Sequence, residues 1–173
     1  RTMPLEHAVH IVAETAKGLH HAHVQRDHRG KPLGIVHRDV SPQNVMIAYS
    51  GDVKLIDFGI ARARGRAAQT TVGTIKGKLR YLAPEIAIGL EPDHRADVFC
   101  AGIVLFELLT GEAMFAPRTD VEAIEMASEA RVRSPRAQNP DVPRELDDIV
   151  MKAWARERDD RFQSAKDLHT ELR

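Results

Sequence analysis

Three polar motifs, and the order in which they occur, constrain the fold and chemistry of this chain more than any other feature. The first is H-R-D-V-S-P-Q-N at residues 37–44, the second is D-F-G at 57–59, and the third is A-P-E at 83–85. Two short apolar runs, 45–48 and 53–56, separate the first two motifs, and the Ser-Gly-Asp between the runs predicts a β-hairpin. An acid and an amide thus lie before the hairpin and a second acid after it, which suits the binding of phosphate and magnesium.

Helical patterns cover most of the rest of the chain. Apolar residues recur at helical spacing from Leu5 to about Val24, and Pro4 suits a helix start. We expect further helices at 96–109, 119–130, 144–155 and 164–172. The composition of residues 25–34 predicts a loop, and that of 135–143 a proline-containing connector. The expected fold class is therefore α+β, mostly α-helical, with one small β-hairpin that carries the polar motifs.

Charge and composition exclude several classes of partner. Lys plus Arg and Asp plus Glu both number 25, so no overall field favours nucleic acid or an anionic membrane. No apolar run reaches membrane-spanning length, because Gly102 and Glu107 interrupt the best one. The single cysteine, Cys100, cannot form an internal disulfide and fits a reducing compartment. We expect a cytoplasmic segment without nucleic-acid or membrane contact, and a membrane anchor elsewhere in a longer parent protein stays open.

The three motifs together resemble those of the eukaryotic-type serine/threonine protein kinase family, and the resemblance runs along the whole chain. The sequence of residues 37–44 and the charged stretch before them are most similar to those of bacterial members. The resemblance implies the C-terminal lobe of a kinase domain, with the catalytic loop at 37–44 and the activation segment at 57–85. The glycine-rich loop, strand lysine and helix glutamate of the N-terminal lobe would lie before Arg1. We therefore expect residues 1–173 alone to bind ATP poorly and to show little turnover.

The resemblance implies roles for the polar residues around the hairpin. Asp39 would accept the proton of the substrate hydroxyl. Asn44 and Asp57 would hold Mg²⁺, with Mn²⁺ as an alternative ion, on the phosphates of ATP. Met46 matches a position that packs beneath the adenine ring, and a core methionine on a strand is the alternative for it.

Other matching residues are expected to have structural roles. His37 and Phe58 correspond to two members of a stacked apolar column, and Asp97 to an acid that holds the backbone of the catalytic loop. An acid that merely favours a helix start is the alternative for Asp97. Glu85 and Arg161 correspond to a buried ion pair beneath the activation segment.

Two departures from the family pattern bear on mechanism. Most serine/threonine kinases have a lysine two residues after the catalytic aspartate, where this chain has Ser41, and a threonine where this chain has Lys78. In the family that lysine and threonine meet at the catalytic aspartate. We therefore expect Lys78 to supply the positive charge near Asp39, with Ser41 as its hydroxyl partner. Loss of function at both positions is the alternative.

The segment from Ile60 to Leu82 is basic and contains no acid. In the family, an arginine such as Arg38 can pair with a phosphate on this segment. We expect phosphorylation at Thr71 or Thr70, with Thr74 as a further candidate, because a phosphothreonine would order the segment through arginine contacts. A solvated basic loop is the alternative.

The function implied is transfer of the ATP γ-phosphoryl group to a serine or threonine of a protein substrate. A kinase dimer for autophosphorylation is a further expected partner. Two alternatives come from other classes, namely a pseudokinase or scaffold that binds a partner through the basic segment, and a helical binding module with accidental motifs. Retention of Asp39, Asn44 and Asp57 argues against the scaffold, because a scaffold has no chemical need for all three. Accidental polar turns would explain each motif singly but not the set.

Several conspicuous residues are discounted as functional. His20, His21 and His23 resemble a metal cluster, but adjacent positions point to different faces of a helix. We expect His94 to be a polar residue at a helix start rather than a catalytic base, and Trp154 to be a core residue.

Overall fold

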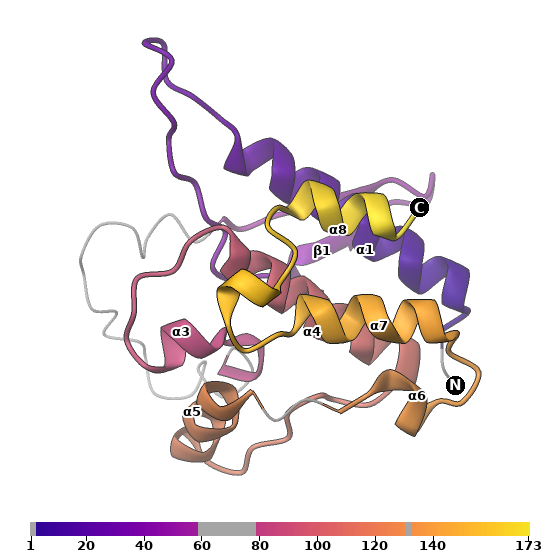
Figure 1. Ribbon diagram of the computed structural model, residues 1–173. Helices are drawn as coiled ribbons and strands as arrows, with labels where there is room; N and C mark the ends of the chain where they lie inside the picture. The colour runs from indigo at the N-terminus through magenta and orange to yellow at the C-terminus, as the bar shows by residue number, and fades with distance from the viewer. Residues whose placement is uncertain (1–2, 59–78, 131–132) are drawn as a thin grey trace.

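The computed structural model describes residues 3–58, 79–130 and 133–173 (Figure 1). The helices and strands follow in the order α1 (Leu5–His23), η1 (Pro42–Asn44), β1 (Val45–Ile47), β2 (Val53–Leu55), η3 (Leu79–Tyr81), α3 (Pro84–Ala87), α4 (Arg95–Thr110), α5 (Asp120–Glu129), α6 (Pro135–Gln138), α7 (Arg144–Ala153), η4 (Arg158–Asp160) and α8 (Ala165–Glu171). Lys78, Thr70, Thr71 and Thr74 lie outside the described residues, so the predictions made for them stay predictions.

Helix α4 forms the centre of the core. It is apolar around almost its whole circumference, so it must be covered on all sides, and α1, α7 and α8 pack against it (Figure 1). The helix ends at Gly111, whose φ of 71° is left-handed and whose N–H donates to the carbonyl of Glu107 over 2.9 Å. The helix expected at 96–109 is therefore confirmed, together with the glycine that closes it.

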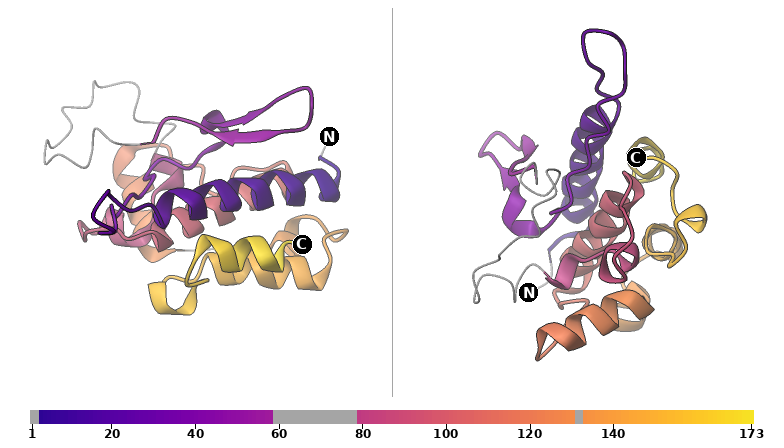
Figure 2. Two further views of the ribbon diagram at one scale, coloured as in Figure 1. Left: turned by 90° about the horizontal axis from the view of Figure 1, so that it is seen from above. Right: turned by 90° about the vertical axis from the view of Figure 1, so that its left-hand side faces the viewer.

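Helix α1 separates the β-hairpin from the C-terminal helices. Its buried face includes Ala8, Val12, Ala16 and Leu19, which recur at helical spacing. The hairpin packs on one side of this helix and α8 on the other, as Figure 2 (left) shows. The long first helix predicted from the sequence thus places the polar motifs on the edge of a helical body.

The β-hairpin pairs β1 with β2 in antiparallel register, with Met46 opposite Lys54. Each strand is one residue shorter than expected. β1 ends before the turn, because the Ala48 carbonyl accepts a hydrogen bond from the N–H of Gly51, whose φ is 90°, and β2 ends before Ile56 at the other end of the hairpin. The Met46 side chain is 53% exposed, so the alternative of a core methionine is wrong.

The C-terminal third largely follows the sequence prediction. Ser164 caps α8, since its hydroxyl accepts from the N–H of Asp167 over 3.1 Å, and Trp154 is buried against Phe106 with ring centroids 5.2 Å apart. The expected connector at 135–143 is wrong in part, because Pro135 occupies the first position of the short helix α6. No helix in the described ranges combines the length and apolar character needed to span a membrane.

Candidate active site

Asp97 anchors the 37–44 loop to the core. Its carboxylate is fully buried near the start of α4, and it accepts hydrogen bonds from the backbone N–H groups of His37 at 2.8 Å and Arg38 at 2.9 Å. Both contacts cross more than fifty positions of sequence, so they depend on the packing of α4 beneath the loop. The role expected for Asp97 is the one the structure shows.

His23 is the second partner of this carboxylate. Its Nε2 lies 2.7 Å from Asp97 Oδ2, and both side chains are almost completely buried. His23 ends α1, and it reaches Asp97 because α1 packs along α4. Sequence reasoning rejected a metal cluster for the three neighbouring histidines but gave no sign of this contact, which only the packing of two helices creates.

Two residues of the candidate site have a strained backbone, Arg38 in the 37–44 loop and Asp57 after the β-hairpin. Arg38 has a φ of 65° and Asp57 a φ of 58°, both in the left-handed region that residues other than glycine rarely adopt. Such conformations cost about 1–3 kcal/mol each and persist only where the surroundings fix them. Strain of this kind is concentrated at functional sites.

His37 joins the loop to the end of the hairpin. Its ring lies 4.5 Å from that of Phe58 between centroids, which confirms the expected stacking. The ring Nε2 is 3.0 Å from the carbonyl of Ile56, and Nδ1 accepts from the N–H of Asp39 over 3.2 Å. We assign the neutral Nε2–H tautomer, because it satisfies both contacts.

Asn44 connects the three candidate chemical residues. Its side-chain N–H donates to the carbonyl of Asp39 over 2.7 Å, and its own carbonyl accepts from the N–H of Ile56 over 2.9 Å. Asp57 follows Ile56 directly. Asp39, Asn44 and Ile56 are therefore joined by hydrogen bonds, and Asp57 is the next residue along the chain. The side-chain oxygen of Asn44 is the type of ligand that Mg²⁺ takes.

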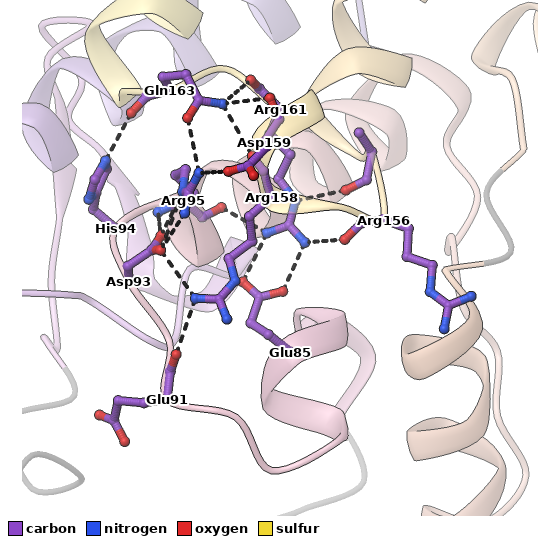
Figure 3. Close-up of polar contacts among 11 residues, drawn as sticks. Glu85, Glu91, Asp93, His94, Arg95, Arg156, Arg158, Asp159, Arg161 and Gln163 are labelled. Atoms are coloured by element: carbon purple, nitrogen blue, oxygen red, sulfur yellow. Dashed lines mark hydrogen bonds and ion pairs between the residues drawn. The ribbon is translucent and has the colours of Figure 1, made fainter.

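Glu85 and Arg161 form the buried ion pair that was expected. Two guanidinium nitrogens lie 2.9 and 2.8 Å from the two carboxylate oxygens (Figure 3). The remaining N–H groups donate to backbone carbonyls, at 2.7 Å for Ala155, 2.9 Å for Arg156 and 3.2 Å for Arg95. Because every charged atom has a partner, this pair fixes α3 to the segment between α7 and α8.

The family model of the protein kinase domain matches residues 1–172 of this chain. The chain belongs to the protein kinase family. Three bacterial relatives illustrate the similarity. The tyrosine-protein kinase MasK of Myxococcus xanthus is 41% identical over 95% of this chain and 25% of its own length. The serine/threonine-protein kinase PknB of Mycolicibacterium smegmatis is 38% identical over 95% of this chain and 25% of its own length. The serine/threonine-protein kinase PrkC of Bacillus subtilis is 33% identical over 96% of this chain and 24% of its own length.

This kinase chain spans about a quarter of the length of those curated relatives. Among solved structures, the twitchin kinase region of C. elegans matches with a TM-score of 0.76 at 21% identity, over 100% of this chain and 29% of that one. At this identity the likeness shows the fold alone. The expected kinase-like, mostly helical fold with a small hairpin is confirmed.

Tyr81, just before the A-P-E motif, is tied to α4. The Tyr81 hydroxyl donates to Glu107 over 2.6 Å, and burial together with this acceptor raises the pKa of Tyr81 well above its usual range. The Cys100 thiol donates to the carbonyl of Tyr81 over 3.0 Å, and burial raises the pKa of this thiol. Cys100 is thus a packing residue without the character of a nucleophile.

A second polar network lies beside Glu85 and Arg161, and the sequence gave no sign of it. Arg95 contacts Asp93 at 2.9 Å and Asp159 at 2.7 Å, and Arg158 contacts Asp93 at 3.1 Å (Figure 3). Burial acts to raise the pKa of Asp93, but the hydrogen bonds and charge of Arg95 and the hydrogen bond of Arg158 outweigh it and hold that pKa well below its usual range. His94, at the start of α4, contacts the carbonyl of Gln163 at 2.9 Å, consistent with the structural role expected for it.

Proposed function

We propose that this kinase transfers the γ-phosphoryl group of ATP to a serine or threonine hydroxyl of a protein. The observation that carries the proposal is the hydrogen-bonded unit formed by Asp39, Asn44 and the residue before Asp57. Phosphoryl transfer requires mainly fixed charge and correct positioning, and the hydrogen bonds of Asn44 to the backbone of Asp39 and of Ile56, which precedes Asp57, support such an arrangement. The proposed catalytic loop is 37–44 and the activation segment 57–85.

Each residue has a separate proposed role. Asp39 accepts the proton of the substrate hydroxyl, while Asn44 and Asp57 hold Mg²⁺, or Mn²⁺, on the nucleotide phosphates. The exposed side chain of Met46 is available on the hairpin for contact with the adenine ring. Ser41 is buried at the start of η1, two residues after Asp39, in the position proposed for the hydroxyl partner of Lys78.

Regulation by phosphorylation belongs to the same proposal. Arg38 precedes Asp39 and directs its guanidinium to an acidic side chain, so it is able to take an anionic partner. Phosphate on Thr70, Thr71 or Thr74 is proposed as the alternative partner, supplied by autophosphorylation in a kinase dimer.

The class of acceptor hydroxyl is the finer part of the proposal. PknB and PrkC are named as serine/threonine kinases, whereas MasK is named as a tyrosine kinase. The experiment is phosphoamino-acid analysis of the intact protein after incubation with radiolabelled ATP and Mg²⁺. We expect phosphoserine or phosphothreonine, and phosphotyrosine alone would overturn the choice of hydroxyl while leaving kinase activity in place.

Metal binding is tested separately with Asp57→Asn. This substitution removes a charged ligand, so we expect the Mg²⁺-dependent part of ATP affinity to be lost in calorimetric titrations of the intact protein. Asp52→Asn, on the exposed turn of the hairpin, is the matched control and should leave the titration unchanged. Equal behaviour of the two variants would contradict the proposed metal site.

A further inference from the structure

Residues 25–34, called the basic hairpin below, form an ordered projection between α1 and the catalytic loop. The sequence predicts only a loop here. Instead, the N–H of Asp27 donates to the carbonyl of Lys31 and the N–H of Leu33 to that of Gln25, each over 2.9 Å, and Arg26 is bridged to Pro32. In Figure 1 and in Figure 2 (right) the basic hairpin stands clear of the helical body. Its conformation therefore comes from its own backbone contacts.

The acidic side chain of the basic hairpin stabilises the turn by accepting backbone hydrogen bonds. Asp27 is the one acid in this segment, and its Oδ1 accepts from the N–H groups of Arg29 at 2.8 Å and Lys31 at 2.9 Å. Gly30 takes the left-handed conformation that closes the turn, with a φ of 78°. The guanidinium of Arg26 donates to the carbonyl of Gly30 over 2.8 Å. The tip is thus a fixed turn, on which the side chains of Arg29 and Lys31 are exposed.

The basic hairpin presents cations beside aliphatic side chains. Arg29 and Lys31 are exposed, and the Lys31 ammonium has no hydrogen bond or ion pair in the described part of the chain. Leu33 is 53% exposed and Val24, at the base, 52%. A segment so exposed adds little to the core, because stabilisation by burial scales with the apolar area removed from water. A role in recognition accounts for its order better than a role in folding.

We propose that the basic hairpin docks an acidic segment of the protein substrate, flanked by an aliphatic residue that contacts Leu33. This inference rests on the proposed kinase function and names the chemistry of its substrate. Charge complementarity selects the partner, since three basic residues stand against one acid here in a chain of zero formal net charge. A protein segment is favoured over a membrane or nucleic acid, because the basic hairpin is small and the chain as a whole has zero formal net charge.

The position of the basic hairpin gives docking a kinetic consequence. Six residues lead from Leu33 to Asp39, so at about 3.3–3.6 Å per extended residue they span at most roughly 20 Å. A substrate held at the basic hairpin is therefore tethered close to the catalytic loop, which raises the effective concentration of its hydroxyl. Docking should lower KM and leave kcat unchanged, because the contact does not differ between the ground state and the transition state.

The test uses the intact kinase and matched synthetic peptides. All contain the same acceptor segment with a serine and a threonine, joined through a linker of about eight residues to a second segment. That segment is Glu-Asp-Leu-Glu-Glu in the acidic peptide and Gln-Asn-Leu-Gln-Gln in the neutral peptide. Each peptide is made with the second segment before the acceptor segment and with it after. The docking variant is Arg29→Glu with Lys31→Glu. The control variant is Arg144→Glu with Lys166→Glu, which reverses two exposed charges on α7 and α8. Steady-state kinetics give KM and kcat, and fluorescence anisotropy gives peptide binding without catalysis.

In the wild type, we expect KM for the acidic peptide to be about tenfold below KM for the neutral peptide. The two KM values should become about equal in the docking variant and should still differ about tenfold in the control variant. The kcat values should agree within about twofold across all proteins. Lys31→Gln alone removes an ammonium without a partner and should reduce the KM preference for the acidic peptide about threefold. This single variant gives a reading even if the double variant has a folding defect.

Three results would overturn docking, namely equal KM for both peptides, an equal loss in the control variant, or hairpin-dependent binding to phosphatidylserine vesicles without any preference between the peptides. If no peptide is phosphorylated, hairpin-dependent binding in the anisotropy measurement still supports docking, while the proposed kinase function fails. If neither phosphorylation nor binding is seen, both proposals fail.

Discussion

The guanidinium of Arg38 lies 3.0 Å from the carboxylate of Glu91, in the segment between α3 and α4. Arg38 is also held through its backbone N–H by Asp97. The carbonyl of Glu91 in turn accepts from Arg158 over 3.3 Å. The residue that precedes the candidate catalytic Asp39 is thus attached to the helical body by two separate acids, one exposed and one buried.

The exposed acid should matter little for stability. Glu91 is 84% exposed, and pairs of this kind contribute about 0–1 kcal/mol. We expect Glu91→Gln to change the unfolding free energy by less than about 1 kcal/mol and to leave Arg38 available to a phosphate on the activation segment. Phosphorylated protein should then keep its activity. A loss of activity of tenfold or more in assays of the phosphorylated variant would contradict this account.

The buried acid should matter greatly. Asp97 accepts from His37, Arg38 and His23, and the amide of Asn offers one acceptor atom in place of two. Asp97→Asn leaves at least one buried donor without a partner, which costs about 1–3 kcal/mol. We expect that loss in urea unfolding, together with reduced activity, because the loop backbone is released. Asp120→Asn, at the exposed start of α5, is the control and should change neither measurement.

The ion pair of Glu85 and Arg161 provides a third prediction. Both side chains are buried, so Arg161→Met leaves an uncompensated carboxylate and should cost about 3–5 kcal/mol of unfolding free energy. The double variant with Glu85→Gln should recover part of that loss. Lys17→Met breaks the exposed pair with Glu14 and should cost less than about 1 kcal/mol. Equal losses for Arg161→Met and Lys17→Met would show that burial does not set the importance of the pair.

Gly102 allows the close packing of α4 against α7 and Trp154. A methyl group on Gly102 would lie 2.7 Å from Trp154 Cδ1 and 3.0 Å from Ala153 Cβ. Gly102→Ala should therefore destabilise the domain by about 1–3 kcal/mol, as overpacking does. Gly18→Ala is the matched control, since nothing lies within 4 Å of its new methyl group and α1 gains about 0.5–1 kcal/mol of stability. Thermal unfolding distinguishes the two, and stabilisation by Gly102→Ala would contradict the packing described.

Much of the loop geometry was predictable from the sequence. The resemblance carried by the three motifs implied the backbone anchor at Asp97, the stacking of His37 on Phe58, and the ion pair of Glu85 with Arg161. Each of these predictions came from the resemblance to the kinase family, and each predicted contact is present in the structure. The helix boundaries followed from periodicity and from local caps such as Ser164 and Gly111.

Contacts between helices that carry no motif were not predictable. His23 reaches Asp97 across 74 positions, and Arg95 reaches Asp159 across 64. Such pairs depend on the relative placement of whole elements, which local sequence does not fix. The order within the basic hairpin was missed for a different reason, because Asp27 stabilises the turn through backbone N–H groups that any residue supplies.

The most direct test of the central claim is the rate at which the intact protein transfers phosphate from radiolabelled ATP, compared between wild type, Asp39→Asn and Asp52→Asn. Removal of a general base lowers such rates by about 10²–10⁴-fold. The account predicts a loss in this range for Asp39→Asn and an unchanged rate for Asp52→Asn. Transfer by Asp39→Asn at the wild-type rate, or a wild-type protein that transfers no phosphate, would contradict it.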